Sequence, residues 1–429
     1  TDDLADPERR FGLSREEVAL MNPNTGTVPV FRTRRDAELT KKLYRAAPVL
    51  VDETTGENPW GISFLRMFDM TNDSHLFRSR EELEAEGFVL EGNRFVCGDE
   101  VYLSLYEGRM IHHFDHRAVS VGITDATQFR SGVSIDTTLE QHADPDFAVQ
   151  PRYWVRAETV REQVPGYERD WFFGFKDITS PTNERTFIGT IIPLSAVGNS
   201  VPLMLWNSEL ASTTIAGLVG SLASFTFDWV ARQKLGGVHV NFYLLEQFPV
   251  LPPDRYTQAL LDIIVPRVVE LSYTAWDLQP FARDVLADVG PERWGRWFAE
   301  APVHQVPGTF PERSLELTLG DMPSVTGSER TGKVPGTSVD TSAGTSSPFP
   351  PPFVWDEDRR AVLRAELDAV YAHLYGLSRE ELAYILDTFP IVKRKDEAAY
   401  GEYRTKRMVL EAFESLDLSG FPRATRLTR

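Results

Sequence analysis

The densest group of side chains that could perform chemistry is a histidine-rich segment, His112-His113-Phe114-Asp115-His116. Its three imidazoles and one carboxylate are ligand types that bind Zn²⁺. Structural zinc sites, however, usually draw their ligands from two separated segments, and this sequence has no second histidine cluster and only one cysteine, Cys97. We therefore expect these histidines to be buried and hydrogen-bonded, or to face DNA, and we expect no metal site in this chain.

The sequence contains no local motif for catalysis. A Gly-x-Ser-x-Gly nucleophile turn, a P-loop and a Gly-x-Gly-x-x-Gly loop are all absent. Paired carboxylates carry no signal, because Asp and Glu account for 63 of the 429 residues. We expect no catalytic residue in this chain, and whether it has an enzymatic activity of its own stays open.

Basic residues form four clusters although the chain is acidic overall. The 45 Lys and Arg residues give a formal net charge of −18, which alone argues against a nucleic-acid-binding protein. Each cluster could be an ordinary solvated face, but together they would suit contacts to the phosphates of a duplex, which position a protein without reading sequence. The clusters are Arg32, Arg34 and Arg35 with Lys41, Lys42 and Arg45; Arg109, His112, His113, His116 and Arg117; Arg232, Lys234 and His239; and Lys393, Arg394 and Lys395 with Arg404, Lys406 and Arg407.

Two polar stretches carry residue types that could contact bases or phosphates. Gln128 and Arg130 lie in a stretch over 122–150 that we expect to be a long surface loop, and Gln and Arg pair bidentately with adenine and guanine. Gly236-Gly237, followed by His239 and Asn241, would let backbone amides approach a phosphate. The alternative is that all of these are ordinary loop residues.

Capping signals and hydrophobic periodicity predict the helices. Apolar residues at three-and-four spacing predict one long buried helix over 208–231, and a last helix is expected over 397–416. The two capping boxes are Ser14 with Glu17 and Ser378 with Glu381.

The region over 59–155 is rich in β-forming residues. A hairpin is predicted where the apolar runs 88–90 and 95–96 flank a turn at Gly92-Asn93. Further strands are predicted over 171–178, 186–192 and 238–242.

These patterns predict an α+β fold in which a β-rich domain with long loops is braced by helices and followed by a C-terminal helical domain. Over 323–352, 21 of 30 residues are Ser, Thr, Gly or Pro, which is typical of a linker because such a segment has little apolar surface to bury. The expected parts are a helical first segment over 1–50, a β-rich target-recognition domain over 51–252 that includes the helix over 208–231, a helical region over 253–310, a flexible linker over 311–352 and a C-terminal helical region over 353–429.

Longer motifs along nearly the whole chain, apart from the linker, resemble those of a known family. They lie at 21–27, 31–39, 58–61, 67–74, 105–117, 177–178 with 182–186, 227–237 with 239–242 and 251–252, 384–390 and 400–407, and include Asn22-Pro23-Asn24-Thr25-Gly26, Thr182-Asn183-Glu184-Arg185-Thr186 and Tyr400-Gly401-Glu402-Tyr403-Arg404. In this order they resemble the C-terminal target-recognition region of large, type IIG-like adenine-specific DNA methyltransferases. That family serves restriction–modification and phage-defence systems of the DISARM and BREX kind.

The departures from the family determine what the resemblance implies. Its catalytic domains hold S-adenosylmethionine at a Gly-rich loop and position a flipped adenine with an Asn/Asp-Pro-Pro-Tyr/Phe motif. Neither motif is present, since Asn22-Pro23-Asn24 and Asn58-Pro59-Trp60 lack the paired proline and aromatic residue. The resemblance therefore implies a non-catalytic half without a cofactor of its own. S-adenosylmethionine is expected in a catalytic methyltransferase domain N-terminal to this chain.

We therefore expect a sequence-specific double-stranded DNA recognition module of an adenine-specific DNA methyltransferase in bacterial anti-phage defence. The alternative is a protein-docking module of a defence complex without its own DNA specificity, and other defence-system proteins are further candidate partners. No signal sequence or membrane-spanning apolar run is visible, and a single cysteine fits a reducing compartment, so we expect a cytoplasmic protein without a membrane partner. The residues expected to contact DNA are Arg32, Arg34, Arg35, Arg109, His112, His113, Arg117, Gln128, Arg130, Arg185, Lys234, Gly237, His239 and Asn241.

Overall fold

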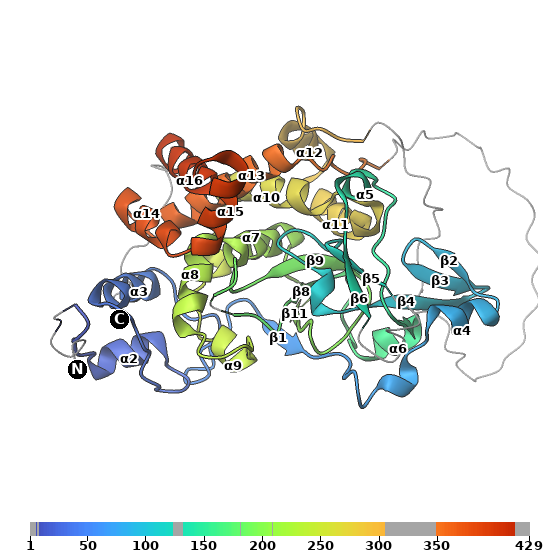
Figure 1. Cartoon of the computed structure of the whole chain (residues 1–429), viewed down its shortest axis with the longest axis horizontal. Coiled ribbons are helices and arrows are strands. Elements are labelled where there is room, and N and C mark those ends of the chain that lie inside the picture. The colour runs from blue at the N-terminus through green and yellow to red at the C-terminus, as the bar shows by residue number, and fades with distance from the viewer. Residues whose placement is uncertain are drawn as a thin grey trace, which may run out of the picture.

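Helices and sheets both build the chain, which confirms the α+β expectation. The computed structural model describes residue 6 and residues 8–122, 132–180, 182–207, 209–304 and 349–416. Helices account for 45% and sheets for 16%. Figure 1 shows the sheets in the centre and at one end of an elongated molecule, with helices above them and at the other end.

The elements of the described residues have the following bounds. The strands are β1 (Ile62–Leu65), β2 (Val89–Glu91), β3 (Arg94–Cys97), β4 (Glu100–Tyr106), β5 (Val119–Gly122), β6 (Val133–Asp136), β7 (Trp154–Arg156), β8 (Trp171–Phe175), β9 (Gly189–Pro193), β10 (Ala196–Val197) and β11 (Leu203–Trp206). The α-helices are α2 (Arg15–Met21), α3 (Arg34–Ala46), α4 (Arg80–Ala85), α5 (Leu139–Ala143), α6 (Ala157–Glu162), α7 (Ser212–Ala223), α8 (Phe225–Lys234), α9 (Phe242–Leu245), α10 (Gln258–Ser272), α11 (Gln279–Val289), α12 (Pro291–Trp297), α13 (Glu357–Leu374), α14 (Arg379–Asp387), α15 (Pro390–Tyr400) and α16 (Arg404–Ser415).

The central sheet has the strand order β1-β11-β8-β9, with every neighbouring pair antiparallel. It is buried on both faces, and successive side chains of a strand point to opposite faces. In β8, Trp171 and Phe173 enter a large core shared with the helices, whereas Phe172 enters a second core beneath the second sheet. This is why β8 is apolar at every position apart from its glycine.

The second sheet has the order β10-β4-β3-β2, with β7 also paired to β4. The predicted hairpin is confirmed, because β2 and β3 pair in antiparallel register around Gly92-Asn93 and Gly92 takes the positive φ of 62° that such a turn favours. Leu103 and Leu105 of β4 pack with Phe172 of the central sheet. The two sheets therefore share one core.

One large core takes residues from the helical first segment, the β-rich region, the helical region after it and the C-terminal helices. It contains Leu43 from the first segment, Trp229 from α8, Ile264 from α10 and Leu386 from α14. Both predicted capping boxes are confirmed, at the start of α2 and of α14. The helices near the two ends of the described chain thus pack on the same core as the central sheet (Figure 1).

The long helix predicted over 208–231 is two helices. α7 ends at Ala223 and α8 begins at Phe225, with Ser224 in extended conformation between them. The Ser224 hydroxyl accepts the Phe227 N–H, so the serine is the N-cap of α8 and ends the first helix. Among the described residues no single helix is long and apolar enough to cross a membrane, and only α7 and α8 taken together, bent by 58°, reach that length and composition.

Three further predictions are wrong in part. The last helix is split into α15 and α16, because Gly401 adopts φ of 74° and ends α15 in left-handed conformation. The strand over 238–242 is a single bridge, between Ile178 and His239, followed by α9. The expected loop over 122–150 contains β6, which pairs with β5, and α5.

Replacing Phe172 with Ala tests whether the second core stabilises the central sheet. Phe172 is fully buried, so its loss leaves a cavity and we expect the free energy of unfolding to fall by about 3–5 kcal/mol. The measurement is urea unfolding followed by circular dichroism. The control Val89→Ala removes an exposed side chain and should change the value by less than about 0.5 kcal/mol. Equal effects of the two variants would contradict this assignment.

Candidate functional site

The histidine-rich segment makes a tight turn that divides its side chains between two environments. The backbone groups of His112 and Asp115 exchange hydrogen bonds of 2.7 and 3.0 Å, and Phe114 between them has a positive φ of 53°. A positive φ is uncommon for a residue with a side chain and marks a constrained turn. His112 and His113 line a cavity, whereas Asp115 and His116 are buried elsewhere.

The buried half of this segment is a hydrogen-bonded structural cluster. His142 Nε2 lies 3.2 Å from Asp115 Oδ2, and His116 Nε2 lies 2.8 Å from Asp277 Oδ1. Within the described ranges, no group of three or more His, Cys, Asp or Glu residues is arranged to hold a metal ion. His116 is therefore buried and hydrogen-bonded, one of the two possibilities that the sequence leaves open for the histidines of this segment.

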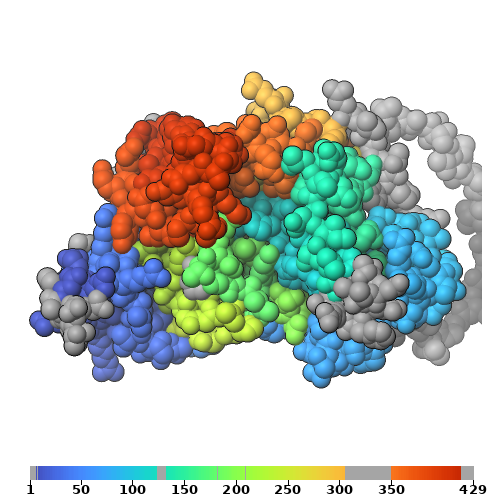
Figure 2. All heavy atoms as spheres, in the orientation of Figure 1, coloured from blue at the N-terminus to red at the C-terminus, as the bar shows by residue number. Residues whose placement is uncertain are grey.

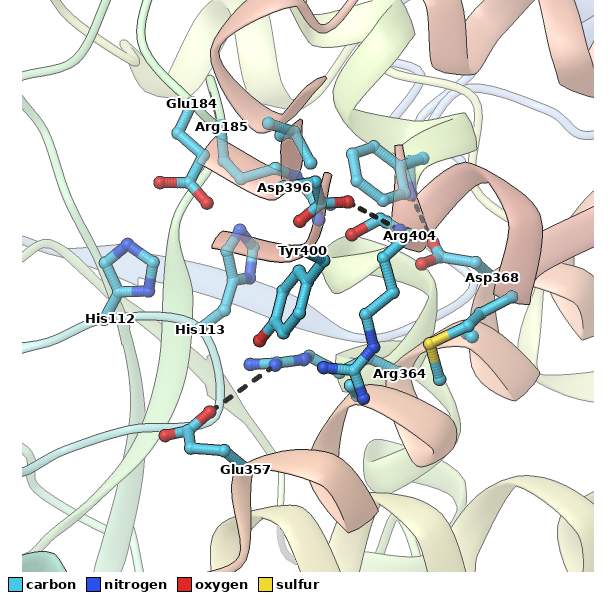
Figure 3. Close-up of a pocket in the computed structure, with 16 residues that line it drawn as sticks. His112, His113, Glu184, Arg185, Glu357, Arg364, Asp368, Asp396, Tyr400 and Arg404 are labelled. Atoms are coloured by element: carbon cyan, nitrogen blue, oxygen red, sulfur yellow. Dashed lines mark hydrogen bonds and ion pairs between the residues drawn. The ribbon is translucent and has the colours of Figure 1, made fainter. Parts of the chain in front are cut away.

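The candidate site is a cavity of about 190 Å³ between the turn at His112-His113 and the C-terminal helices. Glu184 and Arg185 line it from the loop before β9, and Phe225 lines it from the start of α8. The remaining lining residues come from α13, α15 and α16, and include Glu357, Arg364, Asp368, Asp396, Tyr400, Arg404 and Met408. Figure 2 shows the corresponding recess between the C-terminal helices and the middle of the chain, and Figure 3 shows His113, Tyr400 and Arg364 converging on the cavity.

The cavity's two histidines are held in their neutral form. Burial lowers the pKa of His112 to about 4, with the positive charge of Lys176 contributing. Burial also lowers the pKa of His113 well below its ordinary value, and the charges of Arg185, His112 and Arg364 add to the effect. Neutral imidazoles offer one donor and one acceptor each.

Asp368 is the one carboxyl of the described cavity lining whose pKa is clearly displaced towards neutrality. Burial raises the pKa of Asp368 to about 6, although the charge of Arg185 and the Phe225 N–H, 2.6 Å from Oδ1, oppose the change. A carboxyl with this pKa can gain or lose a proton near neutral pH.

The loop that carries Glu184 and Arg185 is attached to α8 by Asp228. This carboxylate has no exposed surface, and its Oδ1 accepts the N–H groups of Thr186 at 2.8 Å and Phe187 at 2.5 Å. Its Oδ2 lies 3.3 Å from the Nε of Arg185. The Arg185 guanidinium also lies over the Phe225 ring, 4.1 Å from the ring centroid. Backbone and charge contacts together fix Arg185 at the cavity wall.

Two residues expected to contact DNA are buried structural groups instead. Arg117 is 0% exposed, and its guanidinium donates to the backbone carbonyls of His142, Asp144, Phe147 and Thr274. Lys234 donates from Nζ to the carbonyls of Met21 and Gln247 and to the Tyr44 hydroxyl, and burial lowers its pKa well below the ordinary value. Arg117 has no exposed surface and the Lys234 ammonium group is hydrogen-bonded inside the fold, so the structure does not present either side chain to DNA.

The other expected contact residues lie in several places. Arg32, Arg34 and Arg35 are exposed where α3 begins, and the Arg35 guanidinium lies 3.9 Å from the centroid of the Tyr384 ring of α14. Arg109 is half-buried and paired with Glu107 at 2.6 Å. Gln128 and Arg130 lie outside the described residues.

The Gly237, His239 and Asn241 segment lies beside the strand end at Asp177. Gly237 and His239 are exposed, and Asn241 is half-buried before α9. His239 Nδ1 is 2.6 Å from Asp177 Oδ2, and Arg66 Nη2 is 2.9 Å from Asp177 Oδ1. Of the expected residues, only His112, His113 and Arg185 meet at the cavity.

Sequence reasoning missed Arg364, Asp368 and Tyr400 as site residues. Arg364 and Asp368 are four apart on α13, which places them on one helix face. Tyr400 belongs to the resembling segment over 400–407, which was the available signal for this wall.

Comparisons with known proteins assign no family to this chain. No family model matches the chain, and neither the curated proteins nor the solved structures that were searched gave a match.

Replacing Asp228 with Asn tests the attachment of the cavity loop. The substitution removes the charge opposite buried Arg185 and directs an amide towards N–H donors, so we expect a loss of about 3–5 kcal/mol in the free energy of unfolding. Glu402→Gln is the matched control because it disturbs an exposed pair with Arg407 and should cost less than about 1 kcal/mol. Chemical denaturation measures both. Stability of D228N equal to that of the control variant would show that the loop is held by other contacts.

The stability of the folded chain should fall in acid through Asp115. Burial would raise the pKa of Asp115, but the hydrogen bond and charge of His142, the charge of Arg360 and the Arg117 N–H together lower it from 3.8 to about 2. Because the folded-state pKa is the lower one, the stabilisation is present above pH 4 and is lost as pH falls from about 4 to about 2. We expect a contribution of about 2 kcal/mol, measured by denaturation at several pH values. Asp115→Asn should flatten this part of the profile, and an unchanged slope would contradict the assignment.

Proposed function

We propose that this chain is the sequence-specific double-stranded DNA recognition module of an adenine-specific, S-adenosylmethionine-dependent DNA methyltransferase in bacterial anti-phage defence. In this proposal a catalytic domain N-terminal to the chain binds S-adenosylmethionine and transfers the methyl group. The chain itself supplies the sequence specificity. It acts in the cytoplasm, where the DNA of an infecting phage is accessible.

The observation that carries the proposal is that segments with the family resemblance, distant in sequence, meet at one place. His112 and His113 belong to the segment over 105–117, Arg185 to that over 182–186, and Tyr400 and Arg404 to that over 400–407. All five line the same cavity. Three separate motifs thus contribute residues to one site, as we expect if they serve one function.

Exposed cations beside this recess support a duplex as the partner. Burial lowers the pKa of Arg232, and the charges of Arg185 and Arg32 add to the effect. Arg232 Nη2 donates to the Asn183 carbonyl at 2.8 Å, and Lys395 of α15 pairs with Glu184. Lys395 thus lies next to the loop that forms the cavity wall, and Arg32 is exposed just before α3. Such side chains contribute to duplex binding by neutralising phosphates.

Duplex titration of the full chain tests the proposal. We expect salt-sensitive binding with a preference among sequences in a duplex library, measured by fluorescence anisotropy at several salt concentrations. Arg32→Ala and Lys395→Ala should each weaken binding about threefold to tenfold for all sequences and lower the salt slope by about one, since each removes one phosphate contact.

The control is Arg80→Ala, which removes an exposed arginine paired with Glu84 on α4, at the opposite end of the molecule (Figure 1). It should leave duplex binding unchanged. Absence of salt-sensitive duplex binding, both alone and with the catalytic domain, would overturn the proposal. If a lysate pull-down then captured stable protein partners, the docking alternative would be favoured.

A further inference from the structure

The cavity holds hydrogen-bond donors that no acceptor within the described chain satisfies. His113 is 6% exposed, and neither of its ring nitrogens has a hydrogen-bond partner. The one polar contact of the Arg364 guanidinium within the described residues is a separation of 3.9 Å between its Nη2 and Glu357 Oε2, which is too long for a hydrogen bond. Buried polar groups in native proteins are nearly always paired. The buried His113 ring therefore needs a partner that the described chain does not supply, and the partly exposed Arg364 guanidinium has N–H donors available to a ligand.

The carboxylates around the cavity, in contrast, already have donors. Phe225 N–H is 2.6 Å from Asp368, and Thr405 N–H is 2.6 Å from Asp396. The Trp355 indole donates to Glu357 at 2.8 Å, and Lys395 pairs with Glu184. The N–H groups of Arg364 and the single N–H of neutral His113 are therefore donors that these carboxylates do not hydrogen-bond, and a ligand with several acceptor oxygens could engage both.

Three guanidinium groups and four carboxylates line this cavity. Arg185 and Arg364 each lower the pKa of His113, and Arg185 contributes to the lowered pKa of Arg364 after burial itself. Arg185 is already paired with buried Asp228, whereas Glu357 lies 3.9 Å from the Arg364 guanidinium. The Arg364 side chain is nevertheless 39% exposed, so it can be reached through the recess.

The size of the cavity limits what can enter it. Its volume of about 190 Å³ is below the roughly 300–1,000 Å³ of sites for drug-sized ligands. An adjoining space of about 20 Å³, lined by His113, Arg185 and Asp368, has room for one water molecule. The site therefore suits one small oxyanion, with a larger substituent projecting past Tyr400 towards the opening.

We propose that this cavity is a phosphate-binding site in which the Arg364 guanidinium binds two phosphate oxygens and the His113 imidazole donates to a third. A guanidinium matches phosphate with two parallel N–H donors, which an ammonium group does not reproduce. The phosphate comes from a small nucleotide in solution or from the backbone of bound DNA. The site goes beyond DNA recognition and does not depend on it.

Calorimetric titration of the full chain with inorganic phosphate and with dAMP tests the site. We expect saturable binding to the unmodified protein. Arg364→Gln should weaken it at least about tenfold, and Arg364→Lys should weaken it about threefold or more because the charge stays but the paired donors are lost. Because Arg364 makes only the 3.9 Å contact, thermal unfolding of the ligand-free variants should be unchanged, which separates lost binding from misfolding.

Arg407→Gln is the matched control, because Arg407 is an exposed arginine of α16 held by Glu402 and Glu411 outside the cavity. It should bind phosphate as the unmodified chain does. Absence of saturable binding of both ligands at millimolar concentration would overturn the site. Equal weakening by R364Q and R407Q would also overturn it, because binding would then reflect net charge alone.

Competition distinguishes the two sources of phosphate. If the group comes from DNA, inorganic phosphate should weaken duplex binding more than chloride does at the same ionic strength. If it comes from a free nucleotide, dAMP should bind more tightly than inorganic phosphate and leave duplex affinity unchanged. Either result supports the site. Failure of duplex binding alone would count against the proposed function and leave the phosphate titration intact.

Discussion

The buried carboxylate of Asp228 joins the candidate site to the core. It lies in the first turn of α8, has no exposed surface, and accepts hydrogen bonds from two backbone N–H groups and from the side chain of Arg185. A buried polar group is costly unless its hydrogen bonds are made, so the contacts of Asp228 hold the loop before β9 against this helix. That requirement places Glu184 and Arg185 at the cavity wall.

Buried arginines hold the histidine-rich turn, which forms another wall of the cavity, in place. Arg360 of α13 donates to the carbonyls of Phe114 and Leu271 at 2.9 and 2.7 Å, and Arg117 donates to four carbonyls around α5 and α10. Backbone carbonyls of irregular segments need partners when buried, and a planar guanidinium with five N–H donors can satisfy several at once. The histidine-rich turn is therefore held to the C-terminal helices by hydrogen bonds as well as by apolar packing.

Local signals in the sequence predicted the elements better than their ends. The hairpin at Gly92-Asn93 and the capping boxes of α2 and α14 depend on neighbouring residues, and all are present. The helix over 208–231 was wrong because apolar periodicity continues across Ser224, while capping of the next helix is decided by which N–H the hydroxyl accepts. For the site, the sequence identified His112, His113 and Arg185. It assigned the same role to Arg117 and Lys234, because the sequence does not show whether a basic residue is buried or exposed.

The sequence by itself determined the α+β class, most of the helices and hairpin, and the residue types available for binding. Those properties follow from short-range periodicity, capping and turn preferences. Only the tertiary structure decided which cations are free to meet a ligand, because that depends on carbonyls and carboxylates that lie outside the local sequence of each cation. Arg364 lies about one helical turn after Arg360 on α13. The Arg360 guanidinium is hydrogen-bonded inside the fold, whereas the Arg364 guanidinium faces the cavity. The long-range packing that separates these two arginines is what turns a basic sequence pattern into a defined site.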